Sequence, residues 1–470
     1  MPESTTAVLE RIERDKDRYL EELMAYLRIP SVSTDPAHRE DVRRCSEFLA
    51  ERMREAGLEV ERIETSGHPL VYGEWTKAEG RPTLLFYGHY DVQPPDPLEL
   101  WRHPPFEPTL EGDRIVARGA TDDKGQSYTH LKAVEATLAE RGELPVNVKF
   151  LVEGEEEAGG EAIDRYIRQD GGDRLACDAV IISDTSMFGS GQPSLLYGLR
   201  GLAYFEITVQ GPNRDLHSGT YGGGVANPAN VLCQVIASLR DPATGRILVP
   251  GFYDDVRELE AWEREEFARL PLDEKAYQAD LGVPELFGEA GYSILERAWT
   301  RPSCDVNGLT AGYQGEGAKT VIPASARAKV STRLVPDQDP QRIAGLVAAH
   351  VARVAPRGAK TAVRFVHGAK PVLIDPQGPL VDAALEALEE IWGAKPVRVR
   401  EGGSIPVVST FSEILEVPVL LMGFGLNDDR LHSPNEKFDL DHFYNGIRTI
   451  ARLLDRVGAV EEVPKAARAR

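Results

Sequence analysis

Cysteine is scarce in this sequence and is never clustered. A thiolate zinc site needs closely spaced cysteines, and a disulfide framework needs a dense, even set in a small secreted chain. Neither pattern occurs among the 470 residues, whose four cysteines are Cys45, Cys177, Cys233 and Cys304. The spacing therefore indicates reduced, mostly buried thiols.

Long apolar runs and an excess of positive charge are also lacking. No window approaches the ~18 to 20 apolar residues that a membrane span needs. The first 30 residues are dense in charge, unlike a secretory signal, so we expect a cytoplasmic protein. The net charge of -21 repels nucleic acids and anionic membranes. We therefore expect small solutes or metal ions as partners, and neither nucleic acid nor membrane.

The first part of the chain alternates short apolar runs with helical patterns. The expected strands are TLLFYG (83–88), VNVKFLVE (146–153) and DAVIIS (178–183). The expected helices cover residues 6–27, 38–56, 125–141 and 160–169. Strands that alternate with helices predict an α/β domain with a mostly parallel sheet, covered on both faces.

The pattern changes near residue 198 and returns near residue 371. Between these points, half-exposed strands are indicated by GLAYFEITVQG, ARAKVSTRLVP and TAVRFVHG, and helices by residues 227–239 and 340–354. This favours an α+β domain inserted into the α/β domain. The predicted limits are 1–198 for the first part of the α/β domain, 199–370 for the insert and 371–470 for the second part.

Acidic and histidine side chains follow the expected strands. In chain order they are His89 and Asp91, the cluster Glu155, Glu156 and Glu157, then Asp184, and finally His432 after the expected strand at 418–425. Asp122 and Asp123 stand just before an expected helix. Ligands bind outside the carboxyl ends of strands in α/β sheets, so we expect these side chains to converge. Imidazoles with carboxylates suit zinc and, with more oxygen, manganese, and this set is large enough for two ions.

Eight segments carry a resemblance to a known family. They are, in this order, YGHYDVQPPDP, ARGATDDKGQ, EGEEEAGG, ISDTSMF, DLHSGTYGG, GAKTVIPASARAKVSTRLVP, REGGSIPVV and LHSPNEKF. Together they resemble the dipeptidase branch of the dinuclear zinc aminoacylase and carboxypeptidase family, which includes carnosinase and the cytosolic nonspecific dipeptidase. The resemblance runs from about residue 20 to 455. It implies a zinc-exopeptidase-like catalytic domain, interrupted by a dimerisation and lid domain.

The resemblance also implies a ligand set for two divalent ions. His89, Asp122 and Asp184 would hold one ion, and Asp122, Glu157 and His432 would hold the other. Asp122 is thus expected to bridge the two ions, with zinc as the expected metal and manganese as the alternative. Asp91 would orient His89 through its second ring nitrogen, as carboxylates around metal sites do.

The general base is one of the three clustered glutamates. From the residues alone, Glu155, Glu156 or Glu157 could take this role. The family pattern has two adjacent carboxylates before a small residue and a glycine, which selects Glu156 as the base and Glu157 as the metal ligand.

The resemblance places substrate-binding residues in and beside the insert. His217 would reach into the site of a second subunit and stabilise the developing oxyanion, which implies a homodimer. Thr320, Arg333 and Ser404 would contact the carboxylate or backbone of the substrate, and an arginine fork suits a carboxylate. On their own, Arg333 could be surface charge and Ser404 a turn residue.

We therefore expect a hydrolase, specifically a metallodipeptidase that cleaves dipeptides or similar short peptides. A metal-dependent deacylase of N-acyl amino acids would need the same metal ligands and is the alternative. A catalytically silent binding protein that keeps the fold is a third reading.

Overall fold

The computed structural model describes residues 3–403 and 405–460 and divides into two compact units. Unit 1 comprises residues 1–197, 374–399 and 406–470, and unit 2 comprises residues 198–373 and 400–405. Unit 2 is thus inserted into unit 1. It also includes the short segment 400–405, which the sequence pattern did not set apart.

The main sheet of unit 1 has a parallel centre and antiparallel edges. Its strand order is β1-β2-β6-β3-β7-β17-β8-β15, and β16 also pairs with β8. The strands are β1 (Glu59–Ile63), β2 (Leu70–Trp75), β3 (Thr83–His89), β6 (Asn147–Glu153), β7 (Ala179–Ile182), β8 (Ser194–Leu199), β15 (Val372–Leu373), β16 (Val397–Glu401) and β17 (Val419–Leu421). Strands β6, β3, β7 and β17 pair in parallel, which confirms the α/β prediction. Strand β2 is antiparallel to β1 and to β6, and the pairing with β1 follows from their short connection, which permits only a hairpin. The sheet is therefore mixed.

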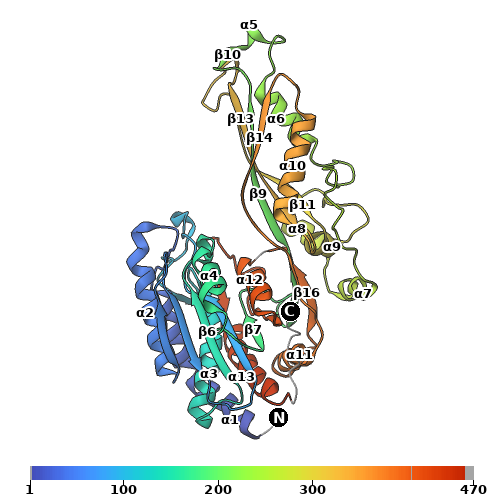
Figure 1. Cartoon of the computed structure of the whole chain (residues 1–470). Coiled ribbons are helices and arrows are strands. Elements are labelled where there is room, and N and C mark those ends of the chain that lie inside the picture. The colour runs from blue at the N-terminus through green and yellow to red at the C-terminus, as the bar shows by residue number, and fades with distance from the viewer. Residues whose placement is uncertain (1–2, 404, 461–470) are drawn as a thin grey trace. The chain divides into compact units, whose positions relative to one another are not determined.

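Helices cover both faces of this sheet (Figure 1). They are α1 (Glu3–Leu27), α2 (Arg39–Glu55), α3 (Lys124–Arg141), α4 (Glu161–Tyr166), α11 (Pro379–Trp392), α12 (Pro406–Leu415) and α13 (Leu440–Gly458). Successive side chains of a strand point to opposite faces. Accordingly, the ring of Phe86 lies 5.0 Å from His130 of α3, and the ring of Tyr87 lies 5.6 Å from Phe411 of α12.

A small antiparallel sheet joins two loops of unit 1 that are far apart in the sequence. It consists of β4 (Thr109–Glu111), β5 (Arg114–Val116) and β18 (Lys437–Asp439) in the order β18-β5-β4. Within it, Lys437 is paired with Val116. The chain that leaves β5 therefore lies beside the chain that enters β18.

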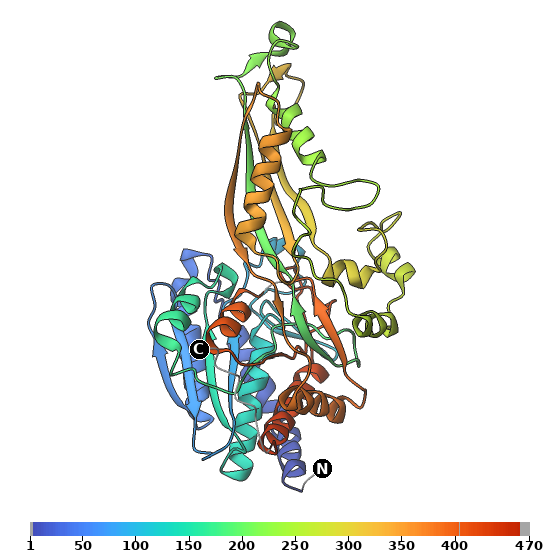
Figure 2. The same cartoon turned by 45° about the vertical axis from the view of Figure 1, so that its right-hand side comes forward.

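Unit 2 is an antiparallel sheet with two helices on one face (Figure 2). The sheet has the order β11-β13-β9-β14, formed by β9 (Gly201–Gln210), β11 (Ser303–Ala311), β13 (Ser325–Leu334) and β14 (Lys360–Ala369). Helices α6 (Pro228–Ala237) and α10 (Pro340–Val354) pack on it. Apolar residues alternate along β9, and Phe205 and Ile207 are fully buried under these helices.

The remaining elements of unit 2 are short. They are β10 (Leu216–His217), α5 (Ser218–Tyr221), α7 (Ala261–Arg269), α8 (Glu274–Asp280), α9 (Ile294–Thr300), β12 (Val321–Ile322) and β15 (Val372–Leu373), and β16 (Val397–Glu401) runs from unit 1 into the 400–405 segment. Strands β10 and β12 form a separate two-stranded ribbon. Among residues 3–403 and 405–460, no helix combines the length and apolar character needed to cross a membrane.

Candidate metal centre

The carboxyl ends of the parallel strands bring the expected acidic and histidine residues together. His89 is the last residue of β3, Asp184 follows β7, and Glu157 lies in a short turn after β6. His432 lies in the loop between β17 and β18, and Asp122 in the segment between β5 and α3. Residues that are more than 300 positions apart in the sequence thus meet at one edge of the sheet.

Two groups of side chains are arranged to hold a cation, and they share Asp122. One group is His89, Asp122 and Asp184, and the other is Asp122, Glu157 and His432. Within each group, the candidate ligand atoms lie within 4.8 Å of one another. One oxygen of Asp122 is 3.2 Å from His89 Nε2, and the other is 2.9 Å from His432 Nε2. Each oxygen of Asp122 therefore faces one of the two histidines.

The donor set and its burial fit metal ions. His89 is fully buried, and its Nε2 has no hydrogen-bond partner of good geometry in the described part of the chain. It faces the oxygens of Asp122 and Asp184 instead, at 3.2 and 3.8 Å. His432 Nε2 faces Asp122 and also Glu157, at 3.4 Å. Imidazole nitrogens combined with carboxylate oxygens are typical of zinc and manganese sites.

The electrostatic field at both groups favours positive charge. Burial would lower the pKa of His89, but the carboxylates of Asp122, Asp91 and Asp184 raise it well above its usual value. Asp122 and Glu157 raise the pKa of His432 to about 10. Burial opposes ionisation of Asp122, yet His432 and His89 hold its pKa below the usual range. The same negative charges would stabilise a divalent cation.

Asp91 connects His89 to the glutamate turn. Its carboxylate lies 3.4 Å from His89 Nδ1 and accepts hydrogen bonds from the backbone N–H groups of Glu156 and Glu157, at 3.3 and 3.1 Å. The hydroxyl of Ser33 donates to it at 2.6 Å. The backbone carbonyl of Asp91 lies closer to His89 Nδ1, at 3.1 Å. Asp91 therefore contacts the imidazole of one group through both its carbonyl and its carboxylate, and its carboxylate holds the turn that carries Glu157 of the other.

The three clustered glutamates have different surroundings. The carboxylate of Glu155 lies directly against Gly67, where an added Cβ would be 1.9 Å from its Oε1. Glu157 contacts His432 and accepts a hydrogen bond from Gln93 Nε2 at 2.7 Å. Glu156 is half-buried beside both groups, and burial raises its pKa well above the usual value. Of the three, Glu156 best fits a proton carrier next to the candidate metal groups.

Several residues at this centre were not identified from the sequence. Ser33 and Gln93 contact Asp91 and Glu157, but no spacing rule relates them to these residues. Asp123, by contrast, was expected beside Asp122 from the sequence; it follows Asp122 through a cis peptide bond and accepts a hydrogen bond from the N–H of His89 at 3.3 Å. Glu436 lies within the LHSPNEKF segment, which pointed to His432 but gave no role to Glu436.

Three of the expected substrate-binding residues, His217, Thr320 and Arg333, lie in unit 2. His217 and Thr320 are exposed, and the ribbon of β10 and β12 brings them together: His217 pairs with Val321, and the N–H of Ser218 donates to the carbonyl of Thr320. Arg333 is near the other end of β13, where burial lowers its pKa. Ser404 lies outside the described residues.

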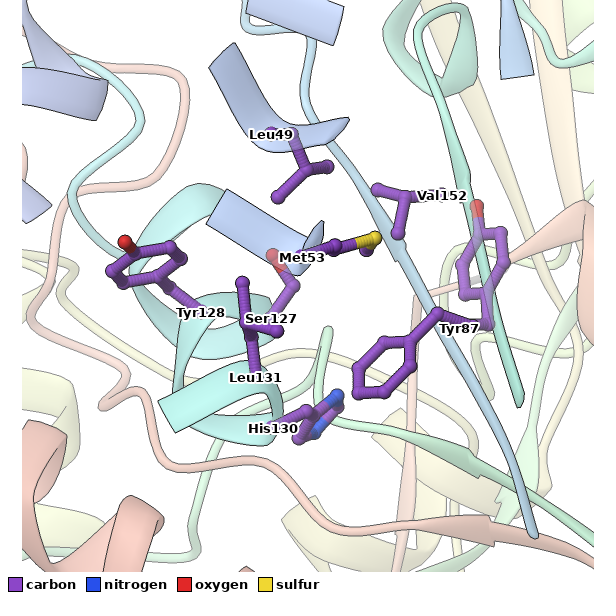
Figure 3. Close-up of a pocket in the computed structure, with 9 residues that line it drawn as sticks. Leu49, Met53, Tyr87, Ser127, Tyr128, His130, Leu131 and Val152 are labelled. Carbon is purple, nitrogen blue, oxygen red and sulfur yellow. The ribbon is translucent and has the colours of Figure 1, made fainter. Parts of the chain in front are cut away.

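A small cavity in unit 1 lies between α2, α3 and the sheet (Figure 3). Leu49 and Met53 of α2 face Ser127, His130 and Leu131 of α3 across it. Burial lowers the pKa of His130 to about 3, so this histidine is neutral. The lining includes none of the metal-centre residues, and this cavity is part of the core rather than a substrate site.

Comparisons with known proteins identify the chain's relatives. The family described as Peptidase family M20/M25/M40 matches residues 85–456. A Cys-Gly metallodipeptidase of Schizosaccharomyces pombe is 34% identical over 475 residues, which cover 98% of this chain and 100% of the relative. The solved structure of the di-peptidase Dug1p from Saccharomyces cerevisiae is 32% identical in sequence to this chain, with a TM-score of 0.85. The crystal structure of human carnosine dipeptidase 1 is 30% identical, also with a TM-score of 0.85. Both structural matches cover 98% of this chain and 100% of the other.

Metal stoichiometry tests the sharing of Asp122. We expect the wild-type chain to retain two divalent ions after dialysis, His432→Ala to retain about one, and Asp122→Ala less than one, because only Asp122 belongs to both groups. Elemental analysis of the dialysed proteins measures this. Glu155→Ala is the matched control and should keep both ions. Equal ion content in His432→Ala and Asp122→Ala would contradict a shared ligand.

Proposed function

Since the chain belongs to the peptidase family M20/M25/M40, we propose that it is a metallodipeptidase that hydrolyses dipeptides with the help of two divalent metal ions. The observation that carries the proposal is the pair of histidine–carboxylate groups that share Asp122. The names of the relatives support dipeptides as the substrate class, since they are a Cys-Gly metallodipeptidase, a di-peptidase and a carnosine dipeptidase.

The ligand assignment follows the two groups of side chains. His89, Asp122 and Asp184 hold one ion, and Asp122, Glu157 and His432 hold the other. We propose zinc, with manganese as the alternative, because two imidazoles with three carboxylates suit either ion. When bound, the ions polarise the scissile carbonyl and lower the pKa of a water molecule.

Asp91 and Glu156 complete the machinery. Asp91 fixes the ring of His89 through Nδ1, so that Nε2 is presented to the metal groups. Glu156 takes a proton from the attacking water and later delivers it to the leaving amine. Its backbone N–H donates to Asp91, so the residue that orients His89 also positions the base.

A glutamine at position 156 tests the role of the base. Glu156→Gln keeps the size of the side chain but cannot accept the proton, so we expect kcat for dipeptide hydrolysis to fall by about 10² to 10⁴-fold. Both ions should remain bound, because Glu156 belongs to neither metal group. Turnover and metal content are measured on the same preparation.

The neighbouring Glu155 provides the control for this experiment. Glu155→Gln removes an adjacent carboxylate that lies against Gly67, so its rate should stay close to that of the wild type. A Glu156→Gln variant with nearly normal kcat would show that another group carries the proton.

We propose that His217 and Thr320 act on a substrate held by another subunit of a homodimer. Within unit 2, Arg333 lies eight residue steps along β13 from Ser325, which is next to the β10–β12 ribbon. At ~3.3 Å per residue this is about 26 Å, much longer than a dipeptide. His217 and Arg333 of one copy therefore cannot hold the same dipeptide. Arg333 would bind the carboxylate of the substrate, and His217 would stabilise the developing oxyanion. Ser404 would be a further contact to the substrate.

Mixed dimers test the action of His217 across subunits. His217→Ala and Asp122→Ala should each be nearly inactive alone, because one lacks the oxyanion donor and the other lacks the shared ligand. In a mixed dimer, one of the two sites combines the intact metal centre of one subunit with the intact His217 of the other. We therefore expect roughly half of the wild-type rate for pure mixed dimers, and roughly a quarter after random subunit exchange, when about half of the dimers are mixed. The rate is measured after subunit exchange, with native mass spectrometry to quantify mixed dimers. Absence of recovery in confirmed mixed dimers would contradict the role.

A further inference from the structure

Glu436 is a fully buried carboxylate that belongs to neither metal group. Its Oε2 accepts hydrogen bonds from the guanidinium of Arg118 at 2.8 Å and from the N–H of Gly119 at 3.0 Å. Its Oε1 accepts from the N–H groups of Thr121 and Asp122, both at 3.0 Å. Two carboxylate oxygens offer about four acceptor sites, so this side chain uses its full capacity on one short segment.

The backbone of Glu436 is tied to the same segment. The N–H of Ala117 donates to the carbonyl of Glu436 at 3.1 Å, and the pairing of β5 with β18 begins at the next residue, Lys437. Main chain and side chain of Glu436 therefore both hold residues 117–122. This segment ends at Asp122, the ligand that the two groups share.

Glu436 also ends the loop that carries His432. This loop has left-handed backbone at Arg430, His432 and Asn435, with φ of 60°, 59° and 64°. Such conformations persist at non-glycine residues only where the surroundings hold them. The side chain of Asn435 does so at one end, because it accepts from the N–H of Arg102 and donates to the carbonyl of Leu100, both at 2.8 Å.

The other end of the loop is also anchored to the Asp122 segment. The carboxylate of Asp429 accepts from the N–H of Leu426 at 2.8 Å and pairs with Lys437 Nζ at 2.7 Å. The hydroxyl of Thr121 lies 3.0 Å from Asp429 and 2.6 Å from the carbonyl of Lys437. Both ends of the His432 loop thus contact the residues just before Asp122.

We propose that Glu436 is a positioning residue that holds the backbone of Asp122 and the His432 loop in a fixed position relative to each other. It thereby sets the contacts in which the two oxygens of Asp122 face His89 and His432. The inference rests on the proposed function, because it concerns the binding of the two ions. Glu436 itself belongs to neither metal group, and its contact with Asp122 is through the backbone N–H.

A simpler role would be a buried ion pair with Arg118 that only stabilises the fold. The contacts distinguish the two roles, since two of the four hydrogen bonds come from the N–H groups of Thr121 and Asp122 and do not involve Arg118. A purely stabilising pair predicts lower thermal stability with unchanged ion binding. A positioning role predicts weaker ion binding in protein that remains folded.

The test replaces Glu436 with glutamine and measures ion binding directly. Glu436→Gln keeps the shape but turns one acceptor oxygen into an NH₂ donor, which must then face two N–H donors. We expect at least one ion to bind about 10 to 100-fold more weakly, as for other residues that support metal ligands. Isothermal titration of the metal-free protein with Mn²⁺ gives the affinities. Electron paramagnetic resonance shows whether two Mn²⁺ ions still couple, and this coupling should be lost or weakened.

A buried glutamate in unit 2 is the matched control. Glu289 pairs with buried Arg301 through two hydrogen bonds of 2.8 Å, remote in sequence from every candidate ligand. Glu289→Gln should lower the melting temperature but leave both Mn²⁺ affinities and the coupling unchanged. Thermal unfolding of each variant establishes that titrations are performed on folded protein.

A second variant covers the case in which Glu436→Gln does not fold. Glu436→Asp keeps the negative charge beside Arg118, but its shorter side chain cannot reach all four donors, so it should also weaken ion binding. Wild-type Mn²⁺ affinities and coupling in either folded variant would overturn the proposal. If the wild type binds two coupled ions but cleaves no dipeptide, the proposed function fails while the role of Glu436 is still tested by the titrations.

Discussion

Two histidines face one buried carboxylate, Asp122, and the local structure of unit 1 is organised around this contact. Asp184 and Glu157 add further negative charge at the same place. Burying an ionised carboxylate costs on the order of several kcal/mol unless charge and hydrogen bonds compensate. The raised pKa values of His89 and His432 express the same demand for positive charge. Two divalent cations meet it, which is why the arrangement points to a metal-dependent hydrolase.

The parts of the fold that carry the metal centre could be predicted from local sequence patterns. The strands expected at 83–88, 146–153 and 178–183 are observed as β3, β6 and β7 to within one residue at each end, because buried parallel strands are short continuous apolar runs. Their parallel pairing then implies that the residues after them converge. The antiparallel edge made by β1 and β2 was not expected, since Glu59–Ile63 is rich in charge and has no clear apolar pattern.

The contacts that orient the ligands could not be predicted in the same way. Ser33, Gln93 and Glu436 act through tertiary hydrogen bonds to Asp91, Glu157 and the Asp122 segment, and no local periodicity marks them. Thr320 and His217 are adjacent because β10 pairs with β12 across about a hundred residues, which pattern reasoning did not detect. The homodimer, the cytoplasmic location, the identity of the metal and the individual roles of the site residues stay predictions.

Release of amino acids from a panel of substrates tests the central claim most directly. The panel contains dipeptides, tripeptides and N-acetyl amino acids, incubated with metal-loaded protein and with protein treated with a chelator. The account predicts rapid cleavage of dipeptides that the chelator stops and added metal restores. Cleavage of the N-acetyl amino acids alone would contradict it and identify a deacylase with the same metal centre.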